Sequence, residues 1–171
     1  MLNNIVNLLN GLEERKFESE ADAVTEKDIN EYGMVLIRNN DILMYSGLAI
    51  ACMAVLNFET MENYVPMIVV DDSFMGLSEG CKLFTIAHEL GHYNRHLTDE
   101  VLLNPEYVRN IEHEFEADEY AALQVGLANA IAGLQELKHA LDVASDGLNE
   151  YGMEEMDIRI NHLMEKFMVT C

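Results

Sequence analysis

Two histidines and a glutamate stand at a spacing that suits metal-dependent hydrolysis. Residues 88–92 read His-Glu-Leu-Gly-His, an H-E-x-x-H pattern inside a stretch of helical periodicity. In a helix, His88 and His92 lie about 40° apart around the axis and about 6 Å apart along it, so both imidazoles face the same way. Two neutral imidazoles on one face are good zinc ligands, and the Glu89 carboxylate can reach a metal-bound water without occupying the metal. The pattern therefore predicts a zinc site at His88 and His92 with Glu89 beside it.

The next helical stretch offers the ligand that this pair lacks. Catalytic zinc commonly takes three protein ligands and keeps one position open, and a carboxylate from a second, packed helix is a standard third ligand. Glu114 and Asp118 are again four residues apart. One of them can therefore bind the metal while the other accepts the hydrogen bond of a ligating histidine. Together the two stretches predict one zinc ion per chain.

Other polar residues near these motifs are alternatives or accessories. His113 is the rival third ligand, but on a helix it points about 100° away from Glu114, so at most one of the two faces the metal. His96 is rotated by about 80° from His88, which favours the rim of the site or a place behind a ligand. A hydrolytic site also needs a hydrogen-bond donor for the oxyanion, and the candidates are Tyr93, Tyr151, His162 and Arg159. Residues of the last two types are more often ordinary surface or core residues than catalytic ones.

The elements that must position these residues follow from periodicity and turn signals. Residues 5–12 have the apolar spacing of a short amphipathic helix, and residues 34–38 and 65–70 are short, β-branched runs typical of strands. Four helices are expected in the second half, over residues 78 to the mid-90s, 104–126, 127–144 and about 153–168, with Asn104-Pro105 as the start signal of the second. The order predicts an α+β fold, a short N-terminal sheet followed by a bundle of about four helices that carries the metal site. The 171 residues predict a single domain over residues 1–171, with a motif-bearing core at about 67–125.

Two segments of the first half are less regular. Residues 42–58 carry no charge, but they are shorter than the roughly 20 apolar residues of a membrane-spanning helix. We interpret them as a buried helix or a strand pair, and expect no membrane span. Residues 13–31 are crowded with acidic side chains, which predicts an exposed helix or loop, with a weak cap at Thr25 and Asp28.

The composition excludes some classes of function. Asp and Glu number 31 against 10 Lys and Arg, a formal net charge of −21 at pH 7. Such a surface repels phosphate backbones and anionic lipids, so we expect neither direct nucleic-acid binding nor membrane contact. The three cysteines, Cys52, Cys81 and Cys171, are odd in number and far apart, which predicts no disulfide framework. With no signal-peptide pattern at the start, these features predict a cytoplasmic protein.

The two motifs resemble those of a known family. Residues 84–92, Phe-Thr-Ile-Ala-His-Glu-Leu-Gly-His, followed by His96, resemble the signature of ImmA/IrrE-type metallopeptidases. Residues 114–121 resemble the downstream motif of that family, E-x-E-A-(N/D)-x-(F/Y)-A. The motif pair is also similar to that of the HtpX and CAAX-prenyl-protease group, and thus to the gluzincins. Residues 157–160 resemble a C-terminal arginine element of the HtpX group, although the histidine expected upstream of it is absent.

This resemblance, which covers about residues 67–125, implies specific roles. It implies a zincin-like fold, zinc ligands at His88, His92 and Glu114, a general base at Glu89, and a hydrogen bond from His88 to Asp118. It further implies that a strand before residue 71 binds an extended substrate along the edge of the sheet. The ImmA/IrrE relatives are understood to cleave DNA-binding repressors, which are basic proteins that an acidic surface would attract.

These observations predict a soluble zinc endopeptidase that hydrolyses peptide bonds by metal-activated water. Its partner is a protein or peptide substrate, and a basic DNA-binding repressor is the one that the resemblance implies. The alternative is a metal-binding regulatory module that has a peptidase-like site without turnover. The presence of Glu89 favours the enzyme, because a site that only binds has no use for that carboxylate.

Overall fold

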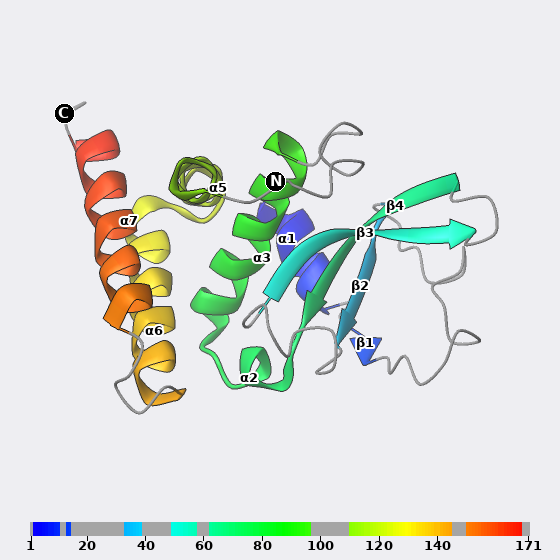
Figure 1. The fold of residues 1–171 in the computed structure, drawn as a ribbon, viewed down its shortest axis with the longest axis horizontal. Helices are drawn as coiled ribbons and strands as arrows, with labels where there is room; N and C mark the ends of the chain where they lie inside the picture. The colour runs from blue at the N-terminus through cyan, green and yellow to red at the C-terminus, as the bar shows by residue number, and fades with distance from the viewer. Residues whose placement is uncertain are drawn as a thin grey trace.

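The computed structural model describes residues 2–10, 13–14, 33–38, 49–57, 62–96, 110–144 and 150–168. Figure 1 shows a sheet at one side, a pair of long helices at the other, and a central helix between them. The helices are α1 (Leu2–Asn10), α2 (Asp72–Met75), α3 (Glu79–Arg95), α5 (Ile111–Val125), α6 (Leu127–Ala144) and α7 (Glu150–Met168). The strands are β1 (Glu13–Glu14), β2 (Val35–Arg38), β3 (Ala49–Asn57) and β4 (Glu62–Val70). This is the expected α+β arrangement, with the strands before the main helices.

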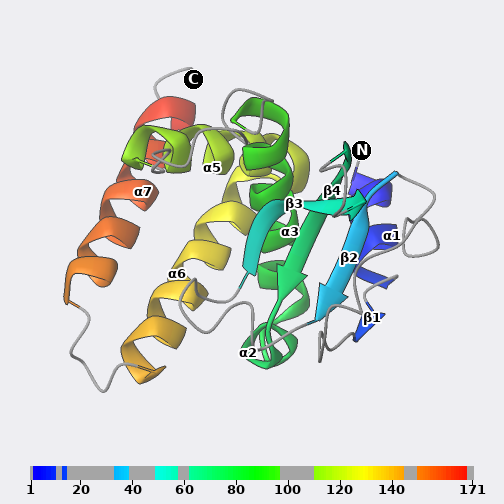
Figure 2. The same ribbon diagram turned by 45° about the vertical axis from the view of Figure 1, so that its right-hand side comes forward.

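The four strands form one mixed sheet in the order β1-β2-β4-β3. Strand β2 pairs with β4 in parallel, with Val35 opposite Met67, while β3 runs antiparallel to β4, with Ala51 opposite Ile68. The strands expected at 34–38 and 65–70 are thereby confirmed, although β4 already starts at Glu62. Strand β3 forms one edge of this sheet, and α3 packs against it. Figure 2 shows the strands crossing in front of α3.

The two irregular segments of the first half are partly described. Residues 49–57 of the uncharged segment form a strand, which agrees with the strand interpretation, and residues 42–48 lie outside the described residues. In the described parts of the chain, every helix is too short or too polar to cross a bilayer. The expectation of a helix or loop was wrong for Glu13 and Glu14, which pair with Ile37 and Arg38 as a short edge strand. The proposed cap at Thr25 lies outside the described residues.

Helix α3 begins where the sequence predicts. The Ser78 hydroxyl accepts a hydrogen bond from the Cys81 backbone N–H at 3.2 Å, which satisfies one of the free donors of the first turn. Glu136 of α6 in turn accepts hydrogen bonds from both the backbone N–H and the hydroxyl of Ser78. The start of the metal-site helix is therefore fixed by a local cap and by a neighbouring helix.

The expected helix over residues 104–126 is wrong at its start. Helix α5 begins at Ile111, and its N-cap is Asn110, whose extended backbone (φ −121°, ψ 172°) excludes a continuous helix through this point. The Asn110 side chain accepts from the backbone N–H of His113 at 3.1 Å. The Asn104-Pro105 signal lies outside the described residues. Gly126 ends the helix as predicted, at a φ of +90° that favours glycine, and α6 follows directly.

One apolar core connects the described elements and surrounds α3. It contains buried side chains from α1 and β4 on one side of α3 and from α6 and α7 on the other, including Ile5, Ile68, Phe84, Leu134 and Leu163. The central helix presents a mixture of apolar and polar groups to its neighbours, because His88, Glu89 and His92 are buried together with Phe84 and Ile86. Ionisable side chains are rarely this buried unless they are paired, so this part of α3 requires polar partners from the neighbouring helices.

Two glycines allow close packing around α3. A Cβ atom on Gly91 would lie 2.8 Å from Ala117 Cα and 3.0 Å from Ala117 O, closer than real Cβ contacts. A Cβ atom on Gly133 of α6 would lie 2.7 Å from the ring of Phe84. Because Gly91 has no side chain, α5 can approach α3 closely at the point where the two histidines face the acidic motif.

Candidate metal centre

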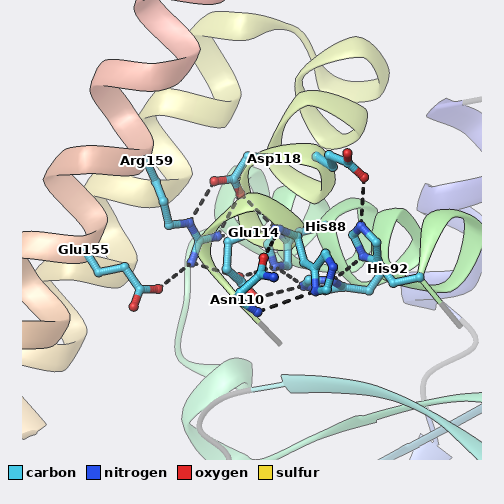
Figure 3. A network of polar contacts seen from close by, with 10 residues as sticks. His88, His92, Asn110, Glu114, Asp118, Glu155 and Arg159 are labelled. Atoms are coloured by element: carbon cyan, nitrogen blue, oxygen red, sulfur yellow. Dashed lines mark hydrogen bonds and ion pairs between the residues drawn. The ribbon is translucent and has the colours of Figure 1, made fainter. Parts of the chain in front are cut away.

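Three side chains from two helices converge on one point. His88 and His92 of α3 face Glu114 of α5, and one ligand atom of each lies within 4.8 Å of the others. The Nε2 atoms of the histidines are 3.0 Å apart, and they lie 3.2 and 3.3 Å from the two carboxylate oxygens of Glu114. Figure 3 shows the three side chains pointing toward one another. These are the three residues that the sequence analysis named as zinc ligands.

The spacing of these atoms fits a tetrahedral cation. Zinc holds nitrogen and oxygen ligands at about 2.0–2.2 Å, so tetrahedral ligand atoms stand about 3.3–3.6 Å from each other. The two Nε2 atoms are 3.0 Å apart, and each lies 3.2 or 3.3 Å from a different oxygen of Glu114, so the ligand atoms are near enough to one another to surround a single such cation. Two imidazole nitrogens and one carboxylate are also a donor set typical of catalytic zinc. The residues present could therefore hold one zinc ion, with a position left for water.

The outer nitrogen of His88 is held by a buried carboxylate. His88 Nδ1 lies 2.8 Å from Oδ1 of Asp118, which has no exposed surface. This contact keeps the hydrogen of His88 on Nδ1 and leaves Nε2 free to bind a metal. Asp118 is the residue that the sequence analysis expected in this role, four residues after Glu114 and thus on the same face of α5.

Arg159 of α7 joins the two acidic groups of the site. Its Nε and Nη2 atoms donate to the two carboxylate oxygens of Asp118 at 2.8 and 2.7 Å, and its Nη1 lies 3.3 Å from Oε2 of Glu114. Only 5% of Arg159 is exposed. The guanidinium therefore neutralises a carboxylate behind His88 and at the same time touches the ligand carboxylate, as Figure 3 shows.

The charged groups at this centre shift one another's pKa values. Burial raises the pKa of Asp118, but the Arg159 charge and hydrogen bonds from Arg159 and His88 outweigh it, so its pKa is held below the usual range. The pKa of Glu114 is also lowered, because hydrogen bonds from His88 and His92 outweigh its burial. Burial lowers the pKa of His88, but Asp118 and Glu114 together raise it to about 9. The metal-free centre thus holds a proton where a cation would bind.

His92 is supported differently. Its Nδ1 lies 3.0 Å from Nδ1 of His96, and the Nε2 of His96 lies 3.0 Å from Oε2 of Glu116. His96 is therefore behind a ligand, as its rotation on the helix predicted. The rival ligand His113 is not part of the converging group; its ring lies against His96, with the centroids 4.5 Å apart, and its Nδ1 accepts from the Asn110 backbone N–H.

The proposed general base and the oxyanion candidates differ in their relation to the centre. Glu89 is buried in α3, between the two histidine ligands in the sequence. His162, an oxyanion candidate, stacks on Phe115 at a centroid distance of 4.0 Å and pairs with Glu119 at 2.8 Å. Tyr93 is half-buried, and the side chain of Tyr151 lies outside the described residues. Of the three candidates whose side chains the structure describes, Arg159 is the one that contacts a ligand residue, and its guanidinium is already paired with the carboxylates of Glu114 and Asp118.

Sequence reasoning undervalued Arg159. A signal was present, because Met156, Ile160 and Leu163 form an apolar face at helical spacing and Arg159 lies at its edge. A cation that is buried beside such a face requires a buried anion, and Asp118 and Glu114 supply it.

The centre is therefore built by α3, α5 and α7, three helices that surround one cation-sized position. Its ligands and their hydrogen-bond partners form a connected polar cluster beside the apolar core, and Glu89 is buried on the same helix as the two histidines. In comparisons with known proteins, no family model, no curated protein and no solved structure matches this chain.

Proposed function

We propose that the chain is a zinc-dependent endopeptidase in which His88, His92 and Glu114 hold the metal. The observation that carries this proposal is the convergence of their three ligand atoms, with the Glu89 carboxylate buried on the same helix. The order of the elements also supports a zincin-like fold of the gluzincin type. An edge strand precedes the helix with H-E-x-x-H, and a second helix brings the glutamate ligand.

The chemistry divides between the metal and the protein. Zinc bound by two histidines and a glutamate lowers the pKa of water toward 7 and polarises a carbonyl oxygen. Glu89 is the general base: its carboxylate accepts a proton from the attacking water and delivers it to the leaving amine nitrogen. Asp118 fixes the ring of His88, and Arg159 fixes both Asp118 and Glu114, so the ligands are held before a metal arrives.

The sheet provides a place for a polypeptide substrate. Strand β3 runs antiparallel to β4, forms an edge of the described sheet, and packs beside α3. An extended peptide can pair with the main chain of such an edge, which gives affinity with little sequence selectivity. The net charge of −21 favours a basic protein as substrate, and a DNA-binding repressor in the cytoplasm meets this requirement.

The proposal is tested by measuring metal content and cleavage together. Zinc in the purified chain is quantified by mass spectrometry, and cleavage is followed on a labelled, unfolded basic protein and on a repressor encoded beside this gene. We expect one zinc per chain in the wild type and in Glu89→Gln, while Glu89→Gln lowers the cleavage rate by about 100-fold or more. Glu112→Gln, at an exposed acid of α5, is the matched control and keeps both properties.

Two results would contradict the assignment. Cleavage by Glu89→Gln at the wild-type rate would remove Glu89 from the mechanism. One zinc per chain in His92→Ala would show that the metal binds elsewhere, because His92 contributes one of the three ligand atoms.

A regulatory module without turnover is the second candidate. Its support is that Arg159, Asp118 and His88 link α7, α5 and α3 whether or not catalysis takes place. Stoichiometric zinc with no cleavage of either test protein would favour this candidate over the enzyme.

A further inference from the structure

We infer that His96 is a positioning residue for the metal ligand His92, and that Glu116 holds His96 in that role. This inference rests on the proposed metal site, and it concerns the side of that site away from Asp118. The three groups form an unbroken chain of contacts, with 3.0 Å between the His92 and His96 Nδ1 atoms and 3.0 Å between His96 Nε2 and Glu116 Oε2.

The end of helix α3 places His96 behind His92. His96 is the C-cap of the helix, and its backbone N–H donates to the carbonyl of His92 at 2.8 Å. The backbone there has left the helical conformation (φ −122°, ψ −26°), while the side chain stays buried, with 7% of the residue exposed. On the other side, the ring of His113 lies 4.5 Å away. His96 is thus confined between α3 and α5, with its Nδ1 facing His92.

The hydrogens in this chain have one consistent arrangement when His92 binds a metal. A neutral histidine that binds through Nε2 carries its hydrogen on Nδ1, so His92 must donate there. The Nδ1 of His96 then has to accept, which places the hydrogen of His96 on Nε2. That nitrogen donates to the Glu116 carboxylate. Each polar atom of the chain is satisfied, and each one fixes the tautomer of the next.

The two histidine ligands therefore have unlike supports. His88 donates to Asp118, whose side chain is fully buried and paired with Arg159. His92 donates to a neutral imidazole, and its chain ends at Glu116, whose side chain is 50% exposed. The His88 side is locked inside the core, whereas the His92 side connects a metal ligand to the surface of α5.

The test compares metal affinity with stability in matched variants. His96→Leu keeps the approximate bulk of the side chain but removes its hydrogen-bond acceptor. His96→Asn places an acceptor oxygen close to the Nδ1 position. Glu116→Ala removes the carboxylate at an exposed position, and Glu112→Ala is its control. Affinity for Co²⁺ and Zn²⁺ is measured by chelator competition, with the visible spectrum of the Co²⁺ form as a probe of geometry and urea unfolding of the metal-free chain as a measure of stability.

We expect His96→Leu to weaken metal binding by about 10- to 100-fold and to alter the Co²⁺ spectrum, and His96→Asn to recover most of the affinity. Glu116→Ala should weaken binding by up to about tenfold, and Glu112→Ala should not. A purely structural role of His96 predicts the opposite combination, with lower stability of the metal-free chain and unchanged affinity of the folded one. That combination would overturn the inference.

Other outcomes are equally decisive. If His96→Leu does not fold, the comparison of Glu116→Ala with Glu112→Ala decides, and equal affinities overturn the inference. Because metal binding is measured without a substrate, a wild-type chain that binds Co²⁺ at His92 but cleaves nothing contradicts the proposed peptidase and leaves this test intact. A wild-type chain that binds no metal overturns both.

Discussion

Arg159 and Asp118 form a bidentate ion pair in the interior of the molecule, with 2.8 Å from Nε to Oδ2 and 2.7 Å from Nη2 to Oδ1. The residues are 41 positions apart and come from α7 and α5. Because the same guanidinium lies 3.3 Å from Glu114, this pair links the last described helix to the metal ligands. The arrangement makes the centre a feature of tertiary packing as much as of the two sequence motifs.

Removal of Arg159 should be costly. Arg159→Met removes the guanidinium from the buried Asp118 carboxylate and leaves His88 as its remaining partner, and we expect a loss of about 3–5 kcal/mol in the free energy of unfolding, measured by urea titration. The control is Lys138→Met, which breaks a half-exposed pair with Asp157 and should cost less than about 1 kcal/mol. Equal losses in the free energy of unfolding would show that the buried ion pair contributes no more to stability than the half-exposed one.

A side chain at Gly91 should separate the two motif helices. In Gly91→Ala the new Cβ would lie 2.8 Å from Ala117 Cα, so α3 and α5 must shift, and we expect a loss of about 1–3 kcal/mol together with weaker zinc binding. Gly80→Ala is the matched control, since it is in the same helix and its Cβ would meet nothing within 4 Å. That variant should gain up to about 1 kcal/mol. Stability is measured by thermal unfolding and zinc affinity by titration for both variants. Unchanged stability and affinity in Gly91→Ala would contradict the close packing.

Zinc affinity should depend on pH through His88. Asp118 and Glu114 overcome the effect of burial and raise the pKa of His88 to about 9 in the metal-free chain, and a metal needs the neutral ring. Below that pH, each metal ion must displace a proton, so the apparent affinity should rise with pH and level off above about 9. Calorimetry in buffers of different ionisation enthalpy should detect the released proton. An affinity that stays constant from pH 6.5 to 9 would argue against His88 as a protonated ligand.

Cleavage of a basic protein should be sensitive to salt. The charge of −21 attracts such a substrate over a range that shrinks from about 30 Å at 0.01 M to about 3 Å at 1 M ionic strength. We expect kcat/KM for a basic protein to fall several-fold over this range, mainly through slower association, while a short neutral peptide serves as control. If both substrates respond alike, the acidity contributes to solubility and not to substrate capture.

The parts of the fold that were predictable depend on local signals. The H-E-x-x-H spacing placed His88 and His92 on one face, and Ser78 and Gly126 were readable as helix boundaries because capping is a local property. The start of α5 was misplaced because the sequence analysis expected one helix from residue 104, whereas α5 begins after the Asn110 cap. The strand at Glu13 was not predictable, because acidic residues have low strand propensity and its pairing with Ile37 is a contact between segments distant in the sequence.

The candidate site was predictable to the extent that it follows helix geometry. Glu114 and Asp118 could be assigned together by their spacing, but the choice of ligand required the resemblance and is consistent with the geometry. The roles of Arg159 and Glu116 could not be read from the sequence alone, since both arise from contacts between helices. For Arg159, the clues in the sequence were its place at the edge of the apolar face of α7 and the resemblance of residues 157–160 to an arginine element.

The position of Arg159 late in the chain has a consequence during synthesis. A ribosome completes α3 and α5, with all three ligands, well before α7 has emerged. Until α7 docks, Asp118 lacks its guanidinium partner and Glu114 lacks its contact with Arg159, so the two carboxylates of the centre are not yet held in place. A chain in which α7 has not yet docked therefore lacks a finished centre, and any chemistry at that centre has to wait until folding is complete.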